Sequence, residues 1–139
     1  MTKSRALVLG SVGFVAANLL HTADHFRQGL GGLTPEVLLG GSVLTVGAIG
    51  TLVLALRGHP RASLAAAAVG LGSAFGVTAS HLAPHWSAFS DPYPELDVDV
   101  LSWAVMLAEI AAALVLASLG IGQLRRQATP REAWQSSST

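Results

Sequence analysis

Residues 98–124 read VDVLSWAVMLAEIAAALVLASLGIGQL, and this stretch decides the fold class. A helix rises about 1.5 Å per residue, so about 20 predominantly apolar residues cross the roughly 30 Å hydrocarbon core of a bilayer. After Asp99 the stretch is long enough for a full crossing, and Glu109 is its only charged residue. It is therefore predicted to be a transmembrane helix.

Three further stretches have the length and composition of a membrane span: 6–28, 37–56 and 62–84. Of the 139 residues, 51% are hydrophobic and only 12% are charged, whereas about 25% of the residues in a typical soluble domain are charged. Thr34, Pro35 and Glu36 form a good start for the second helix, because they supply a cap, a first-turn proline and a carboxylate at the positive end of the helix dipole. We predict an all-α integral membrane protein with a bundle of four transmembrane helices.

The basic residues predict how this bundle is oriented, because Lys and Arg gather on the cytoplasmic side of membrane proteins. With a cytoplasmic N-terminus, only Arg27 lies outside, and seven basic residues lie inside: Lys3, Arg5, Arg57, Arg61, Arg125, Arg126 and Arg131. We expect both termini to be cytoplasmic, with residues 1–126 as the transmembrane domain of a cell (bacterial inner) membrane protein and 127–139 as a disordered cytoplasmic tail. A cleaved signal ending near Ala17 is disfavoured, since the apolar run continues through Leu19 and Leu20.

Small residues predict how the helices pack, because lipid provides no hydrophobic drive for helices to associate. Gly72 and Gly76 form a GxxxG pair on the third predicted helix, which also carries Gly70, and other glycines lie on the first and second. We expect them to allow close packing within the bundle.

Four of the five histidines stand in two pairs with a spacing of four residues: His21 with His25, and His81 with His85. On a helix this spacing stacks two imidazoles on one face, which is how a helix presents both to one metal ion. The first and third helices run in the same direction, so both pairs should meet near the outer membrane face. With no cysteine in the chain, these nitrogens and nearby carboxylates would suit Zn, Cu(II), Fe or Mn.

Two acidic residues are candidates for catalytic roles beside these histidines. Asp24 is either a ligand, a group that orients an imidazole, or simply the partner of Arg27. Glu109 lies about ten residues into its helix, roughly 15 Å from the outer end. It is a metal ligand, general base or proton carrier, or else a neutral acid hydrogen-bonded to one of three residues: Asn18, Ser42 or Thr45.

The function favoured by these patterns is a small membrane-embedded protein that binds a divalent transition metal (Zn, Cu or Fe). An open coordination position would make it a metalloenzyme acting on a lipid-soluble or periplasmic small molecule. The alternatives are a haem b cytochrome with His21 and His81 as axial ligands, a proton or ion transporter using Glu109, and an accessory subunit. The expected partners are the lipid bilayer and, as one option, further copies of the chain, with no nucleic acid.

Overall fold

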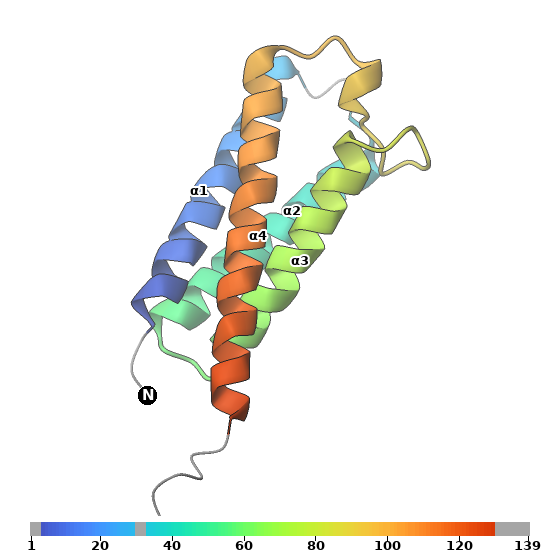
Figure 1. The fold of residues 1–139 in the computed structure, drawn as a ribbon. Helices are drawn as coiled ribbons and strands as arrows, with labels where there is room; N and C mark the ends of the chain where they lie inside the picture. Colours follow the sequence, from blue (N-terminus) through green and yellow to red (C-terminus); the bar gives the residue numbers. More distant parts are fainter. Residues whose placement is uncertain (1–3, 30–32, 130–139) are drawn as a thin grey trace, which may run out of the picture.

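The computed structural model describes residues 4–29 and 33–129. Within those residues every regular element is helical, and four long helices and one short 3-10 helix follow in order (Figure 1): α1 (Arg5–Gln28), α2 (Pro35–Leu56), α3 (Ala62–His81), η2 (Tyr93–Glu95) and α4 (Val100–Ala128). All four long helices are long and apolar enough to cross a membrane. The predicted all-α fold, with four helices long and apolar enough to span a membrane, is therefore confirmed.

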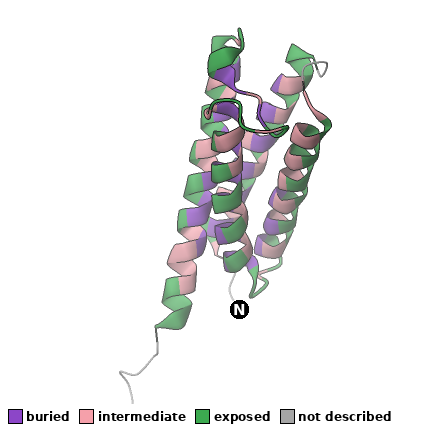
Figure 2. Cartoon of the chain, turned by 90° about the vertical axis from the view of Figure 1, so that its right-hand side faces the viewer, coloured by how far each residue is buried: buried purple, intermediate pink, exposed green. Residues whose placement is uncertain are grey.

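The helices run alternately up and down, so α1 and α3 point in the same direction (Figure 1). The packing of α4 is most extensive against α3 and then α1, whereas α1 and α3 barely touch. Buried residues are concentrated on the faces that the helices turn toward one another (Figure 2). The C-terminal ends of α1 and α3 consequently lie at the same end of the bundle.

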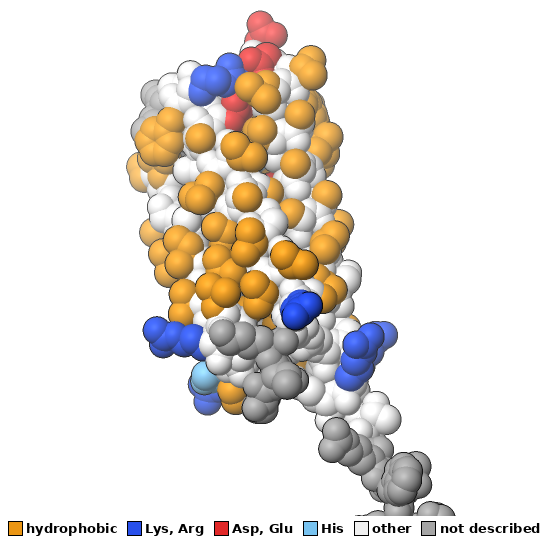
Figure 3. All heavy atoms as spheres, turned by 90° about the vertical axis from the view of Figure 1, so that its left-hand side faces the viewer, with side chains coloured by type: hydrophobic (Ala, Val, Ile, Leu, Met, Phe, Trp, Pro, Cys, Tyr) orange, Lys and Arg blue, Asp and Glu red, His pale blue; other side chains and the backbone are white. Residues whose placement is uncertain are grey.

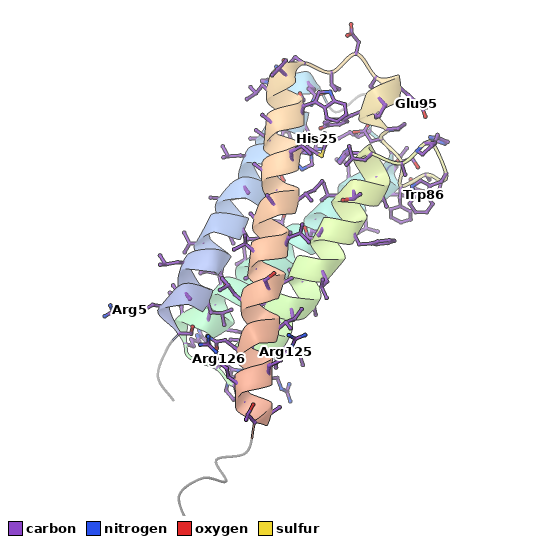
Figure 4. All side chains as sticks on the ribbon, in the orientation of Figure 1. Arg5, His25, Trp86, Glu95, Arg125 and Arg126 are labelled. Carbon is purple, nitrogen blue, oxygen red and sulfur yellow. The ribbon has the colours of Figure 1, made fainter. Side chains whose placement is uncertain are left out.

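Apolar side chains cover the middle of the outer surface, and charges mark its two ends (Figure 3). Arg5, Arg125 and Arg126 lie at one end, whereas Glu95 lies at the other together with His25 (Figure 4). This is the distribution of charge expected for a bundle surrounded by lipid.

The predicted starts of two helices agree well with the structure, whereas some predicted ends do not. Thr34 accepts a hydrogen bond from the Val37 backbone N–H at 3.2 Å and caps α2, as expected. However, α3 ends at His81 and not at 84, because the chain folds back there and the Asp91 N–H donates to the Ser80 carbonyl at 2.9 Å. The last helix continues to Ala128, so the predicted tail begins helically, and its residues 130–139 lie outside the described part.

Some of the glycines expected to allow close helix packing do so, and others do not. A Cβ on Gly70 would lie 2.6 Å from the backbone of α4, and one on Gly120 would lie 2.6 Å from the backbone of α3. By contrast, a Cβ on Gly72 or Gly76 would meet no atom within 4 Å. The GxxxG prediction was wrong for packing within the bundle, because this pair faces away from the α3–α4 contact.

Of the four long helices α2 is the least buried, above all in its first half. The buried residues of α2 are Ala48, Thr51 and Ala55, all in its second half. No residue between Pro35 and Gly47 is buried. This leaves space beside α2 at the same end as the histidines.

Candidate metal centre

Three histidines meet at the end of the bundle where α1 and α3 terminate: His21, His25 and His81. One nitrogen of each ring lies within 4.8 Å of the others. The His21 ring centroid is 4.7 Å from that of His25 and 5.0 Å from that of His81. They converge because α1 presents two of them one turn apart and α3, running parallel, ends on the third. The part of the chain that the structure describes thus brings together three of the four predicted ligands.

His21 is held by Glu109. Its Nδ1 lies 2.5 Å from Oε2 of this carboxylate, and both side chains are buried. The other carboxylate oxygen of Glu109 accepts hydrogen bonds from Asn18 Nδ2 at 2.9 Å and from Ser73 Oγ at 3.4 Å. A carboxylate surrounded by donors is best satisfied when ionised, so Nδ1 of His21 carries the proton and Nε2 keeps its lone pair.

His81 is oriented in the same way by the backbone. Its Nδ1 lies 3.0 Å from the Asp91 carbonyl oxygen, and the Asp91 carboxylate lies 3.5 Å away. A carbonyl oxygen only accepts hydrogen bonds, so Nδ1 of His81 is the donor. Its Nε2 is therefore also left with a lone pair for a ligand.

His25 differs from the other two because its ring has no hydrogen bond to any described residue. It is half-buried and lines a cavity beside the histidine group. An imidazole without a fixed partner can turn either nitrogen toward a bound ion.

His85 does not join the group. Because α3 ends at His81, His85 is not on the helix, and the helical pairing expected from its spacing is absent. The residue is exposed, and its backbone N–H donates to Glu95 Oε1 at 3.3 Å.

Asp24 also lies apart from the imidazole nitrogens and pairs with Arg27, which was one of the readings of the sequence. Its two oxygens accept hydrogen bonds from Arg27 Nε and Gln28 Nε2, each at 2.7 Å. Arg27 also reaches Asp99 at 2.9 Å and Ser102 at 3.1 Å, which ties α1 to α4. The backbone N–H of Ser102 and the Arg27 guanidinium lower the pKa of Asp99, so this link keeps its charge at neutral pH.

Glu109 makes the contact with Asn18 that the sequence suggested as one alternative. Thr45 joins indirectly, since its hydroxyl donates to Asn18 Oδ1 at 2.8 Å. Ser42 instead donates to the Leu38 carbonyl of its own helix. Glu109 is 1% exposed, and its hydrogen bond with Nδ1 of His21 fixes the orientation of that ring.

Two residues from the segment between α3 and α4 complete the site, and the sequence analysis did not place them there. Tyr93 is 1% exposed. Its ring lies 4.6 Å from that of His81, and its hydroxyl lies 3.4 Å from Nε2 of His21. The other residue, Asp91, orients His81. The local sequence Asp91, Pro92, Tyr93, Pro94 is the feature that could have pointed to these two residues. It has no helical or strand periodicity, so it does not predict where the two side chains point.

Burial changes the acid–base properties of both residues. It raises the pKa of Tyr93 to about 12, so the hydroxyl stays a neutral hydrogen-bond donor. It also raises the pKa of Asp91. These groups close the site from the end of the bundle.

A cavity of about 440 Å³ adjoins the histidines. Its walls come mainly from apolar residues of α2 and α3, whereas its polar end is formed by the three histidines with Asn18 and Glu109. A cavity with apolar walls and a few convergent polar groups is typical of small-molecule sites.

The histidine geometry does not suit a haem between His21 and His81. Two axial imidazoles on opposite sides of one iron would place their ring centroids about 6 Å apart, with the porphyrin between them. The observed centroid separation is 5.0 Å, about 1 Å less than a haem between the two rings would require. A single ion is the better match to these donors.

The chain matches no protein-family model, no curated protein sequence and no solved structure, so the candidate centre rests on its own geometry.

Proposed function

We propose that this protein binds one divalent transition metal ion within the membrane, through His21, His25 and His81. The observation that carries the proposal is the orientation of two of these rings. His21 and His81 each have an acceptor on Nδ1, at 2.5 and 3.0 Å, so that Nε2 of each keeps a lone pair. The Tyr93 hydroxyl, 3.4 Å from Nε2 of His21, would turn aside when the ion binds. Metal-binding histidines in proteins are held in this way, with the far ring nitrogen donating to a carboxylate or carbonyl.

The distances are compatible with one shared ion. A metal held at about 2.0–2.1 Å by tetrahedral imidazoles has its nitrogens about 3.3 Å apart. The present nitrogen separations are at most 4.8 Å, so the rings would have to come closer together to bind one ion. The ring of His25, which has no hydrogen bond in the described residues, is the freest to turn.

Three neutral nitrogen ligands favour Zn, Cu(II) or Fe. They also leave a fourth position for water or substrate, which is the arrangement of catalytic zinc sites. We propose that this position makes the protein a metalloenzyme in which the metal activates its fourth ligand. Glu109 would then tune the metal through His21.

The site is proposed to face the outer side of the cell membrane, with both termini cytoplasmic. The excess of Lys and Arg at the opposite end of the bundle supports this orientation. A small molecule would reach the metal either from the lipid or from the periplasm.

The test is elemental analysis of the detergent-purified protein, together with its visible absorption spectrum. We expect near-stoichiometric Zn, Cu or Fe without a Soret band, and loss of that metal in His21→Ala and His81→Ala. The matched control is His85→Ala, because His85 is an exposed histidine outside the group. Full metal content in both His21→Ala and His81→Ala would refute the proposed site. A Soret band would show that the protein binds haem and not a single metal ion.

A further inference from the structure

We infer that the metal site takes a membrane-dissolved amphiphile with a single apolar tail and an anionic oxygen headgroup, of the long-chain carboxylate class. We further infer that this ligand enters sideways from the lipid, between α2 and α3. The inference rests on the proposed metal site and names the ligand class that the site would receive. Three features of the site carry it: the walls of the cavity, the covering of its outer end and the charge at its polar end.

The cavity is built for a molecule with one polar end. Its α2 wall includes Leu39 and Val43, and its α3 wall includes Phe75 and Val77. Gly40, Gly41 and Gly76 also line it and keep it wide, since a Cβ on Gly41 or Gly76 would meet no atom within 4 Å. At the other end lie the three histidine rings. An apolar tail fits these walls, and a headgroup fits only at the histidines.

The opening of the cavity is on the lipid-facing side of the bundle. Phe75 is 77% exposed and Val43 62% exposed, although both line the cavity. No residue in the outer half of α2 is buried. The side of the cavity is therefore open between apolar groups that face hydrocarbon in a bilayer. Trp86, also on the cavity wall, lies at the end of the bundle beside the opening (Figure 4), at a level typical of the membrane interface.

Entry from the aqueous end is blocked by the segment between α3 and α4. The buried Tyr93 lies against His81 and reaches toward His21. His21 and His81 are 5% and 4% exposed. In the described residues this covering leaves His21 and His81 almost inaccessible from the aqueous end, whereas a lipid-dissolved ligand reaches the histidines through the side.

The headgroup follows from the charge of the proposed centre. An ion held by three neutral imidazoles keeps its double positive charge, and a borderline metal with an open position readily takes a carboxylate oxygen. The histidines lie near the outer ends of α1 and α3, which is the depth at which the headgroup of a membrane amphiphile lies. A carboxylate can therefore bind the metal while its tail remains in the apolar cavity.

The test is photolabelling with a diazirine derivative of palmitic acid, using the protein in phosphatidylcholine nanodiscs. Gly76→Leu places a bulky side chain in the cavity and leaves all three histidines in the sequence, and Gly72→Leu is the matched control. Gly72 is one turn away on the same helix, also has open space around a Cβ, and does not line the cavity. We expect labelling of α2 and α3 in the wild type and in Gly72→Leu, and a several-fold decrease in Gly76→Leu with unchanged metal content. Excess palmitate should compete, and hexadecanol should compete much less.

The metal content of the same samples separates the two proposals. Equal labelling of Gly76→Leu and wild type overturns the inference even where metal is bound, and equal competition by hexadecanol overturns the anionic headgroup. Absence of metal from the wild type overturns the proposed function. In that case, sideways entry of the amphiphile is still supported if labelling is lower in Gly76→Leu than in the wild type and unchanged in Gly72→Leu.

Discussion

Glu109 is a fully buried carboxylate in a helix that otherwise carries no charge before Arg125. An isolated ionised group in such surroundings is very unfavourable. Three neighbours compensate for that cost: His21 at one oxygen, and Asn18 and Ser73 at the other. In the described residues no buried side-chain polar atom lacks a hydrogen bond. This network both stabilises the charge and fixes the direction of the His21 ring.

Replacement of Glu109 by Gln should weaken metal binding while retaining the fold. The amide has nearly the same volume, but it is a weaker acceptor for the His21 N–H, so the imidazole becomes a poorer ligand. Loss of such an orienting partner typically lowers metal affinity about 10–100-fold. A competition titration against a chromogenic chelator measures the change.

Glu95→Gln is the control for this experiment, because Glu95 is exposed and its measured hydrogen bond is to the His85 backbone. Its metal affinity should equal that of the wild type. Wild-type affinity in Glu109→Gln would mean that Glu109 does not act through His21.

At the scale of the helices, two glycine contacts hold α3 against α4. A Cβ on Gly70 would lie 2.6 Å from the Ala113 carbonyl oxygen, and one on Gly120 would lie 2.7 Å from the Ser63 carbonyl oxygen. Both neighbours are backbone atoms and cannot move aside as a side chain can. Close approach of two backbones adds van der Waals contact, which is the main attraction available between helices in lipid.

Gly70→Ala should therefore destabilise the bundle. Overpacking typically costs about 1–3 kcal/mol, and the upper part of that range is expected because the clash is with backbone. Thermal or denaturant unfolding of the purified protein in detergent measures it. Gly72→Ala, on the same helix with no atom within 4 Å of a Cβ, should be neutral or slightly stabilising, because alanine is the better helix former. Equal stability of the two variants would contradict the packing described here.

At the scale of the whole molecule, charge divides the bundle into two different ends. Arg5, Arg125 and Arg126 lie at the end where α1 begins and α4 finishes, whereas Glu95 and His25 lie at the other end (Figure 4), and the acidic side chains visible in Figure 3 gather at one end of the molecule. Positively charged segments are retained on the cytoplasmic side during insertion. The polar site is accordingly expected at the outer face.

Labelling of single introduced cysteines can test this orientation. The chain contains no cysteine of its own, so no native residue contributes background labelling. Two exposed positions at opposite ends are suitable, Asp97 and His59. A membrane-impermeant maleimide added to intact cells should label Asp97→Cys, and should label His59→Cys only after the cells are permeabilised. The reverse pattern would place the histidines on the cytoplasmic side.

The sequence by itself determined the spans and the parallel direction of α1 and α3. A membrane span depends on the summed hydropathy of one continuous segment, and helix direction follows from the number of crossings; neither depends on distant residues. That is why His21, His25 and His81 could be expected at one end, and why Asn18 could be proposed as a partner of Glu109.

Only the tertiary structure decided which groups meet. The exclusion of His85 depends on where the chain folds back after His81, and the roles of Asp91 and Tyr93 depend on the path of a segment that has no periodic pattern. The glycine contacts depend on the rotation of each helix about its own axis, which a motif such as GxxxG does not contain. These features come from contacts between residues distant in the sequence, so no local pattern encodes them.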